Sequence, residues 1–316
     1  MNIKKEPASN RTIISGVKPF NLQYTLECGQ AFRWRPYEDT DPDWNGIGRH
    51  SYVGVAGGRI LRLWQEAGDV DNLVVEDVDG DMVDFVIRYF GLEKDHQRIE
   101  SELKQMDPVL SKAVEFASGL RLASQDPWEC LISFIISARN SIPLIQRAVE
   151  NLCKTFGHEI QDGFFAFPEP RALASAPVDE IEKCGTGFRA PYVKLAAETV
   201  SSGALNFEAL RELSSDEIRK ALLSLKGVGP KIADCVLLFG LGRYEAFPVD
   251  IWIARIMSFF YFGGKQVPLE QIRGFAVRQF GRLAGYAQEY LYYYARTCLA
   301  RHLRSFARDT SRRNSY

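Results

Sequence analysis

The stretch that decides the fold is LLSLKGVGPKIADCVLLFGLGRYEAFPVD, residues 222–250. Its apolar residues first follow helical spacing, the pattern breaks at GVGP (227–230), and a second apolar helical pattern then begins at Ile232. The two glycines allow a sharp turn and a close approach of a ligand to the backbone, and proline suits the first position of a helix. We therefore predict two helices joined by a tight hairpin whose free backbone N–H groups can bind a phosphate.

Two residues beside this hairpin suggest chemistry. Lys231 follows the hairpin directly, and Asp250 ends the sequence FPVD nineteen positions later. This pattern resembles the helix-hairpin-helix DNA glycosylases and, among them, the 8-oxoguanine DNA glycosylase/lyases. The resemblance implies that Lys231 is the nucleophile and Asp250 its partner. Taken singly, the lysine could instead bind a phosphate, the aspartate could be a plain helix cap, and the hairpin could be an ordinary turn. The hairpin residues expected to contact the DNA backbone are Gly227, Val228 and Gly229.

The expected roles of Lys231 and Asp250 follow from the chemistry of the family. A lysine amine attacks carbon only when it is neutral, and the positive end of a helix dipole favours the neutral amine. In the family, the amine attacks C1′ of the damaged nucleoside and displaces the base, and the Schiff base that results permits strand cleavage by β-elimination. Asp250 would stay ionised, stabilise positive charge that develops on the sugar, and cap the helix that begins at residue 251.

The resemblance also implies a pocket for an extruded base, since such enzymes must take the nucleotide out of the stack. The sequence CGQAFRW (28–34) resembles the family's SGQSFRW strand, in which the glycine carbonyl accepts a hydrogen bond from the N7–H found only in the oxidised base. Gly29 matches that glycine. Cys235 lies one helical turn after Lys231 and matches a cysteine that stacks on the base. The alternatives are a bulge glycine and an inert buried cysteine.

A second half of this pocket is expected from GYAQEYLYYY, residues 285–294, which is similar to the family's GWAQAVLF segment. The match places Gln288 on the Watson–Crick edge of guanine and Tyr292 on the face of the base opposite Cys235. Tyrosine stands where phenylalanine is common, which preserves an aromatic stacking face. The remaining tyrosines of this segment are expected to be core residues.

Two further motifs are expected to contact the partner strand. The sequence ARNSIPL (138–144) corresponds to the family's SNNNIAR turn: Asn140 matches the central asparagine, Arg139 replaces a neighbour, and Leu144 stands where the eukaryotic enzymes use an arginine on the estranged cytosine. We therefore expect weaker selectivity for cytosine than in the eukaryotic enzymes. Phe188 and Arg189, in GTGFRAPY, match a Tyr-Arg pair that wedges into the duplex and contacts the estranged base.

The composition sets limits on the class of protein. The chain has 316 residues, a net charge of −1 and six scattered cysteines without a CxxC pair. The near-neutral charge is not the usual signature of a nucleic-acid-binding protein, although six arginines between residues 296 and 313 provide local positive charge. The cysteine spacing predicts neither disulfides nor an iron–sulfur cluster. We expect no cofactor and no catalytic metal, while a monovalent cation at the hairpin stays an open question. The N-terminus has no signal sequence, so we expect an intracellular monomer.

The pattern along the chain predicts an α+β protein, with an N-terminal antiparallel-sheet domain followed by an all-α helix-hairpin-helix core. We expect strands at 20–26 and 31–37, a hairpin at 51–65 around two glycines, and a helix at 79–90. Asp126-Pro127 is a strong helix start that opens a helix apolar on all sides, and a second helix is predicted at 142–156. The predicted domains are a disordered tail (1–11), the α+β domain (12–105), the helical domain (106–304) with its hairpin motif (222–240), and a polar tail (305–316).

The sequence therefore predicts a bifunctional DNA glycosylase and abasic-site lyase that removes 8-oxoguanine from duplex DNA. One alternative is a glycosylase for another damaged purine on the same scaffold, although monofunctional members typically lack the hairpin lysine. The other is a non-catalytic helix-hairpin-helix DNA-binding protein, which would need neither the Lys231–Asp250 pair nor the pocket residues.

Overall fold

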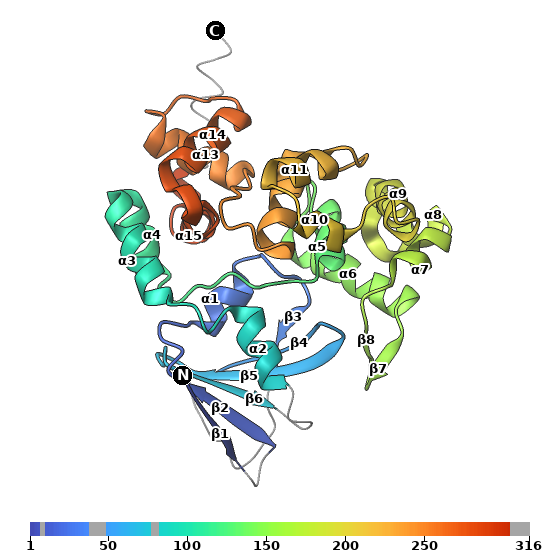
Figure 1. Cartoon of the computed structure of the whole chain (residues 1–316), viewed down its shortest axis with the longest axis horizontal. Coiled ribbons are helices and arrows are strands. Elements are labelled where there is room, and N and C mark those ends of the chain that lie inside the picture. Colours follow the sequence, from blue (N-terminus) through green and yellow to red (C-terminus); the bar gives the residue numbers. More distant parts are fainter. Residues whose placement is uncertain (7–9, 38–48, 77–81, 304–316) are drawn as a thin grey trace.

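The computed structural model describes residues 1–6, 10–37, 49–76 and 82–303. It consists of an antiparallel sheet at one end of the molecule and a group of helices at the other (Figure 1). Each half has its own hydrophobic core: one lies around the sheet and α2, and a larger one fills the space between the helices. The α+β fold class, with the sheet first and the helices after it, is confirmed.

The sheet has six antiparallel strands in the order β1-β2-β6-β5-β4-β3. Two long strands, β4 and β5, form the hairpin predicted around Gly57-Gly58, and both glycines have positive φ. The strand bounds are β1 Asn2–Glu6, β2 Arg11–Ser15, β3 Trp34–Pro36, β4 Arg49–Ala56, β5 Arg59–Glu66 and β6 Asn72–Glu76.

Two predictions for the N-terminal region were wrong. Residues 2–6 form the edge strand β1, paired with β2, and not a disordered tail. Because most of this strand is exposed and backbone hydrogen bonds hold it, its polar composition carried no strand signal. Residues 22–27 form helix α1 (Leu22–Glu27) and not a strand, because the Asn21 side chain caps the helix by accepting from the Tyr24 N–H at 2.8 Å.

The helical half begins with a helical hairpin, α3 and α4, which packs on α14 and α15 at the outer side of the core (Figure 1). The predicted boundary between the two domains, after residue 105, falls inside α3, and the domain boundaries remain predictions. The helices described are α2 Met82–Phe90, α3 His96–Met106, α4 Pro108–Phe116, α5 Pro127–Ile136, α6 Ile142–Phe156, α7 Pro170–Ser175, α8 Val178–Ile181, α9 Ala190–Ser201, α10 Phe207–Arg211, α11 Ser215–Leu223, α12 Pro230–Cys235, α13 Ile251–Tyr261, α14 Leu269–Phe280 and α15 Ala284–Thr297.

Helix α5 is the central helix that the sequence predicted. Its Asp126 cap accepts from the Glu129 N–H at 2.9 Å, Pro127 is at the first position, and nearly every residue of the helix is buried. Helix α6 has the predicted bounds, and α2 agrees with the predicted helix from Met82 onward. A short hairpin of β7 (Glu159–Gln161) and β8 (Phe164–Phe165), and the helix α14, were not predicted.

The predicted C-terminal polar tail, 305–316, lies outside the described residues. Within the described ranges, no helix is both long enough and apolar enough to cross a membrane.

The segment between α4 and α5 lies against both halves, and its Arg121 is only 1% exposed. Its guanidinium donates to the carbonyl oxygens of Val17 at 2.6 Å, Gly91 at 2.7 Å and Pro19 at 3.2 Å. These carbonyls belong to two other connecting segments of the sheet half. One buried cation therefore ties together three connecting segments where the sheet and the helices meet.

Candidate active site

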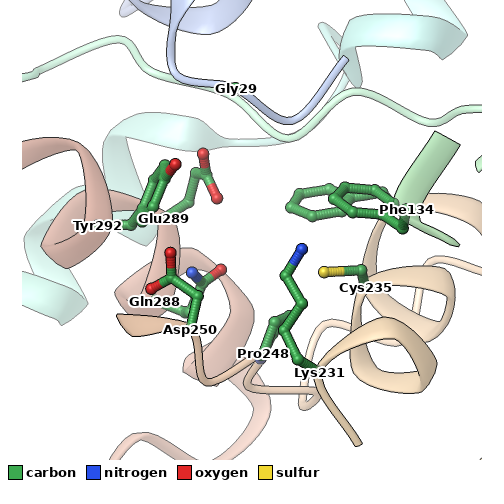
Figure 2. Close-up of a pocket in the computed structure, with 10 residues that line it drawn as sticks. Gly29, Phe134, Lys231, Cys235, Pro248, Asp250, Gln288, Glu289 and Tyr292 are labelled. Carbon is green, nitrogen blue, oxygen red and sulfur yellow. The ribbon is translucent and has the colours of Figure 1, made fainter. Parts of the chain in front are cut away.

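A pocket lies where α5, α12, α15 and the loop after α1 meet. It brings together Gly29, Lys231, Cys235, Asp250, Gln288 and Tyr292, the residues predicted for catalysis and base binding. In Figure 2, Lys231 and Cys235 come from one wall, while Asp250, Gln288 and Tyr292 come from the other. The pocket opens into a larger groove that also contains the turn at 138–141 and the start of α13. The structure thus assembles segments separated by up to about 260 positions in the sequence.

The hairpin between α11 and α12 has the predicted geometry. Gly227 has φ +92°, and a Cβ there would lie 2.4 Å from the Tyr192 ring, so both conformation and space require glycine. Gly229 precedes α12, and Pro230 is at the first helical position. A Cβ at Gly229 would meet no atom within 4 Å, which leaves this face of the hairpin open to a ligand. Lys231 is consequently on the first turn of a helix, as predicted.

Two residues hold the Lys231 side chain inside the pocket: Phe134 of α5 and Ser137, the C-terminal cap of that helix. Its Nζ donates to the Ser137 Oγ at 3.0 Å and lies 4.6 Å from the centre of the Phe134 ring. The Ser137 hydroxyl in turn donates to the Phe134 carbonyl at 2.7 Å, which leaves its lone pairs facing the amine. Neither residue was predicted, because both are more than ninety positions from Lys231 in sequence.

Asp250 caps α13. Its Oδ1 accepts from the N–H groups of Trp252 at 2.9 Å and Ile253 at 2.8 Å. Burial raises the pKa of Asp250, whereas these two N–H groups and the charge of Lys231 favour its ionised form. The side chain is thus fixed in the wall opposite Lys231, with its second oxygen unused by the cap (Figure 2).

Cys235 and Tyr292 are well placed to bind a flat ligand from two sides. Burial raises the pKa of the Cys235 thiol to about 12, so the group stays a neutral, polarisable surface. The Tyr292 hydroxyl accepts a hydrogen bond from Arg296 at 3.3 Å, and the Arg296 guanidinium lies 5.4 Å from the ring centre. Arg296 also donates to the Glu27 carbonyl at 2.8 Å and so links α15 to the Gly29 loop.

Gly29 occupies a position that only glycine fits. Its φ is +101°, and a Cβ would lie 2.7 Å from the Ile142 Cδ1 and 3.0 Å from an Arg296 nitrogen. The neighbouring Gln30 is buried, and its amide bonds to the backbone of Thr25, Arg121 and Ala123. These bonds fix the loop, and with it the orientation of the Gly29 carbonyl. Gln30 was not predicted as a functional residue.

Two consecutive residues of α15, Gln288 and Glu289, line the pocket and are both polar and buried. Gln288 is 4% exposed and its Oε1 has no hydrogen-bond partner among the described residues. Glu289 is 2% exposed and its Oε1 is likewise unpartnered within the described chain. An unsatisfied buried acceptor is costly, so both side chains are suited to a polar ligand. Glu289 was not predicted.

The turn predicted to contact the partner strand borders the larger groove. Arg139 is exposed with φ +52°, and Asn140 holds the turn by donating to the Ile136 carbonyl at 3.3 Å and accepting from the Ser141 N–H at 3.0 Å. Both line the groove next to Lys231. Leu144 is exposed, one turn into α6.

Phe188 and Arg189 differ from one another in exposure. Phe188 is 61% exposed on the glycine-rich turn before α9, as a wedge residue would need to be. Arg189 is only 7% exposed, and its Nε donates to the Ala138 carbonyl at 2.7 Å. Arg189 therefore ties the Phe188 turn to the 138–141 turn, and its predicted contact with an estranged base would require it to leave this carbonyl.

Two consecutive segments of the chain match family models: residues 12–131 match "8-oxoguanine DNA glycosylase, N-terminal domain", and residues 132–276 match "HhH-GPD superfamily base excision DNA repair protein". A probable N-glycosylase/DNA lyase of Methanothermobacter thermautotrophicus is 34% identical over 60% of this chain and 68% of its own length.

Two solved structures are similar over nearly their whole length. One is MBOgg1 in complex with a low-affinity DNA ligand, 40% identical with a TM-score of 0.85, covering 94% of this chain and 99% of its own. The other is Clostridium acetobutylicum 8-oxoguanine glycosylase/lyase with double-stranded DNA containing cytosine opposite 8-oxoguanine, 35% identical with a TM-score of 0.85, covering 94% and 98%.

The chain belongs to the 8-oxoguanine DNA glycosylase family of the HhH-GPD superfamily. The family assignment made from the hairpin, Lys231 and Asp250 is thereby confirmed, whereas the roles of individual residues stay predictions. With the family established, the pocket of Figure 2 is the candidate active site, and the groove beside it the candidate DNA interface.

Proposed function

We propose that this protein extrudes 8-oxoguanine from duplex DNA, excises it, and cleaves the abasic strand by β-elimination. The observation that carries the proposal is the pocket itself: a lysine on the first turn of the hairpin helix faces a capping aspartate across a cavity closed by a buried cysteine and a tyrosine. The relatives described above support a bifunctional glycosylase and lyase.

In this mechanism Lys231 is the nucleophile. Ser137 accepts a hydrogen bond from its Nζ and so aims the lone pair of the neutral amine into the pocket, toward C1′ of the extruded nucleoside. Attack at C1′ breaks the bond to the base, which leaves with its electron pair. The attached amine then loses a proton, the C1′–O4′ bond of the sugar ring opens as O4′ takes up a proton, and the open sugar remains bound to Nζ as a protonated Schiff base. Loss of the proton at C2′ then expels the 3′ phosphate.

Asp250 stabilises this reaction electrostatically. Its cap hydrogen bonds fix the carboxylate opposite Lys231, and its negative charge stabilises positive charge on the sugar as the bond to the base breaks. When the extruded base fills the pocket and displaces its water, this interaction becomes stronger.

Base recognition uses the remaining pocket residues. The Gly29 carbonyl accepts from N7–H, Gln288 binds the Watson–Crick edge, and Cys235 and Tyr292 contact the two faces. Phe188 is the wedge, and Arg139, Asn140 and Arg189 bind the partner strand. Because Leu144 has no donor, we expect modest selectivity for cytosine opposite the lesion. A monomer acting inside the cell, without a cofactor, completes the proposal.

The test is trapping with borohydride on duplexes that carry 8-oxoguanine opposite each of the four bases. The wild type should form a covalent adduct that Lys231→Gln loses completely, while Lys226→Gln, an exposed lysine of the same hairpin segment, should still form it. Base release without an adduct would mean a monofunctional glycosylase. Neither release nor adduct, with DNA binding intact, would favour a binding protein or another purine as substrate.

A further inference from the structure

Glu289 is a buried carboxyl group in the pocket wall for which the mechanism above has no use. It follows Gln288 on α15, is 2% exposed, and its Oε1 meets no hydrogen-bond partner within the described residues. In Figure 2 its carboxyl group points toward the loop at Gly29, whereas Gln288 lies lower on the same wall. Glu289 thus occupies the wall between the two groups assigned to the edges of the base.

Burial, more than any charged neighbour, sets the charge of this carboxyl group. Burial raises the pKa of Glu289 to about 7. The titratable groups around it are the Cys28 thiol on the Gly29 loop, Arg296 and Tyr292 on α15, Asp250 at the start of α13, and Lys231 and Cys235 on α12. Arg296, Lys231 and the thiol, which forms a side-chain hydrogen bond with the carboxyl group, favour ionisation, and Asp250 opposes it. A substantial share of Glu289 is therefore a neutral acid at neutral pH, and a neutral carboxylic acid can donate a hydrogen bond.

The chemistry of the base identifies what this donor would contact. Around the edge of 8-oxoguanine, the N7–H donor is followed by the O6 acceptor and then by the N1–H and 2-amino donors. With N7–H at the Gly29 carbonyl and N1–H at Gln288, the group between them is O6. O6 needs a donor, and the wall between Gly29 and Gln288 carries Glu289 (Figure 2).

We propose that Glu289, in its protonated form, donates a hydrogen bond to O6 of the extruded base and is a specificity residue for 6-oxopurines. This inference rests on the proposed function, because it uses the orientation of the base that Gly29 and Gln288 define. The Glu289 contact gives O6 of the base a hydrogen-bond donor, which the contacts assigned to the other pocket residues do not provide.

The proposal predicts a pH effect with a defined sign. Below about pH 7 the neutral acid donates a hydrogen bond to O6. Above this pH the acid loses its proton and the resulting carboxylate repels O6, so release of 8-oxoguanine slows. Glu289→Gln keeps a donor of the same shape that does not titrate, and the decline near pH 7 should disappear. Glu289→Met keeps the approximate volume without any donor, and release should slow about tenfold or more at pH 6.

The experiment is single-turnover release of 8-oxoguanine from a duplex, measured between pH 5.5 and 9 for the wild type and both variants. Glu129→Gln is the matched control. Burial also raises the pKa of Glu129 to about 7, but its carboxylate faces Arg33 at 3.6 Å and lies outside the pocket. This control should keep the wild-type decline. Circular dichroism checks that each variant is folded.

Three results would overturn the inference while leaving the proposed function intact. These are Gln and Met variants that both release the base at the wild-type rate, Gln and Met variants that are equally slow, or a decline near pH 7 that persists in Glu289→Gln. Two variants at the wild-type rate would mean that Glu289 only packs in the pocket wall, and two equally slow variants would mean that its carboxyl group gives up its proton to the leaving base. A wild type that releases no 8-oxoguanine would instead defeat the proposed function, and the O6 contact with it.

Discussion

Ser137 and Ser224 show how one residue acquires a role from its surroundings. Each is the C-terminal cap of a helix, and each donates its hydroxyl proton at 2.7 Å to the carbonyl three residues earlier. Only Ser137 also accepts a hydrogen bond from Lys231, because the end of α5 lies against the first turn of α12. The same local motif thus only caps a helix at one site, while at the other it also holds Lys231, the proposed nucleophile.

Substitution of Ser137 by alanine is expected to slow adduct formation. Loss of one hydrogen bond that aims the amine should lower the single-turnover rate about three- to tenfold, with little change in DNA affinity. Ser224→Ala removes the same capping bond and should leave the rate unchanged. Equal rates for the two variants in borohydride trapping would show that Ser137 does not position the amine.

At the scale of elements, α3 and α15 meet through a buried polar cluster. The His96 ring nitrogen lies 3.0 Å from the Tyr290 hydroxyl, which donates to Glu100 at 2.8 Å. Burial lowers the pKa of His96 to about 3, and the charge of Arg121 acts in the same direction. The histidine is therefore neutral in the folded protein, and this cluster orients the helix that carries Gln288, Glu289 and Tyr292.

This cluster predicts acid sensitivity. The unfolded chain binds a proton at His96 near pH 6.5, but the folded protein does so only near pH 3, so stability is lost as the pH falls between these values. His96 should contribute about 1.4 kcal/mol of lost unfolding free energy per pH unit between about pH 6 and pH 3. In urea denaturation, His96→Gln should show a correspondingly shallower slope than the wild type. His158→Gln, at an exposed histidine, should keep the wild-type slope; a slope unchanged in both would refute the assignment.

At the scale of the whole molecule, the sheet half and the helical half must keep a fixed relation, because Gly29 reaches the pocket from one half and Lys231 from the other. Arg121 and Gln30 maintain this relation through hydrogen bonds to backbone carbonyls, and not through an apolar interface alone. Burial lowers the pKa of Arg121 to about 10, which still leaves it charged at neutral pH. A charge without its partners would be strongly unfavourable here.

Arg121→Met should therefore be among the most destabilising single changes in this chain. It leaves buried carbonyls unpaired, and we expect a loss of about 3 kcal/mol or more in unfolding free energy, measured by urea denaturation. Arg98→Met, which removes an exposed pairing with Glu102, should cost under about 1 kcal/mol. Similar losses for the two variants would mean that water replaces the Arg121 guanidinium.

The family, the fold class and the pocket residues could be predicted because their signals are local. The hairpin, Lys231 and Cys235 lie on consecutive turns of one short segment, and helical spacing alone puts the last two on one face. The Asp126 cap and the bounds of α6 likewise depend on neighbouring residues. Interactions among a few adjacent residues determine such features.

Other features depended on the assembled molecule. The strand pairing of residues 2–6 depends on a ladder with β2, Ser137 meets Lys231 across ninety-four positions, and Arg189 is bound to the 138–141 turn. Glu289 reads in sequence as an ordinary polar residue of a helix, and only its burial against the Gly29 loop gives it a raised pKa and an unpaired oxygen. Desolvation and contacts between distant segments exist only once the chain has folded, so the sequence by itself indicated which residues form the candidate site, while the tertiary structure decided their charge, orientation and partners.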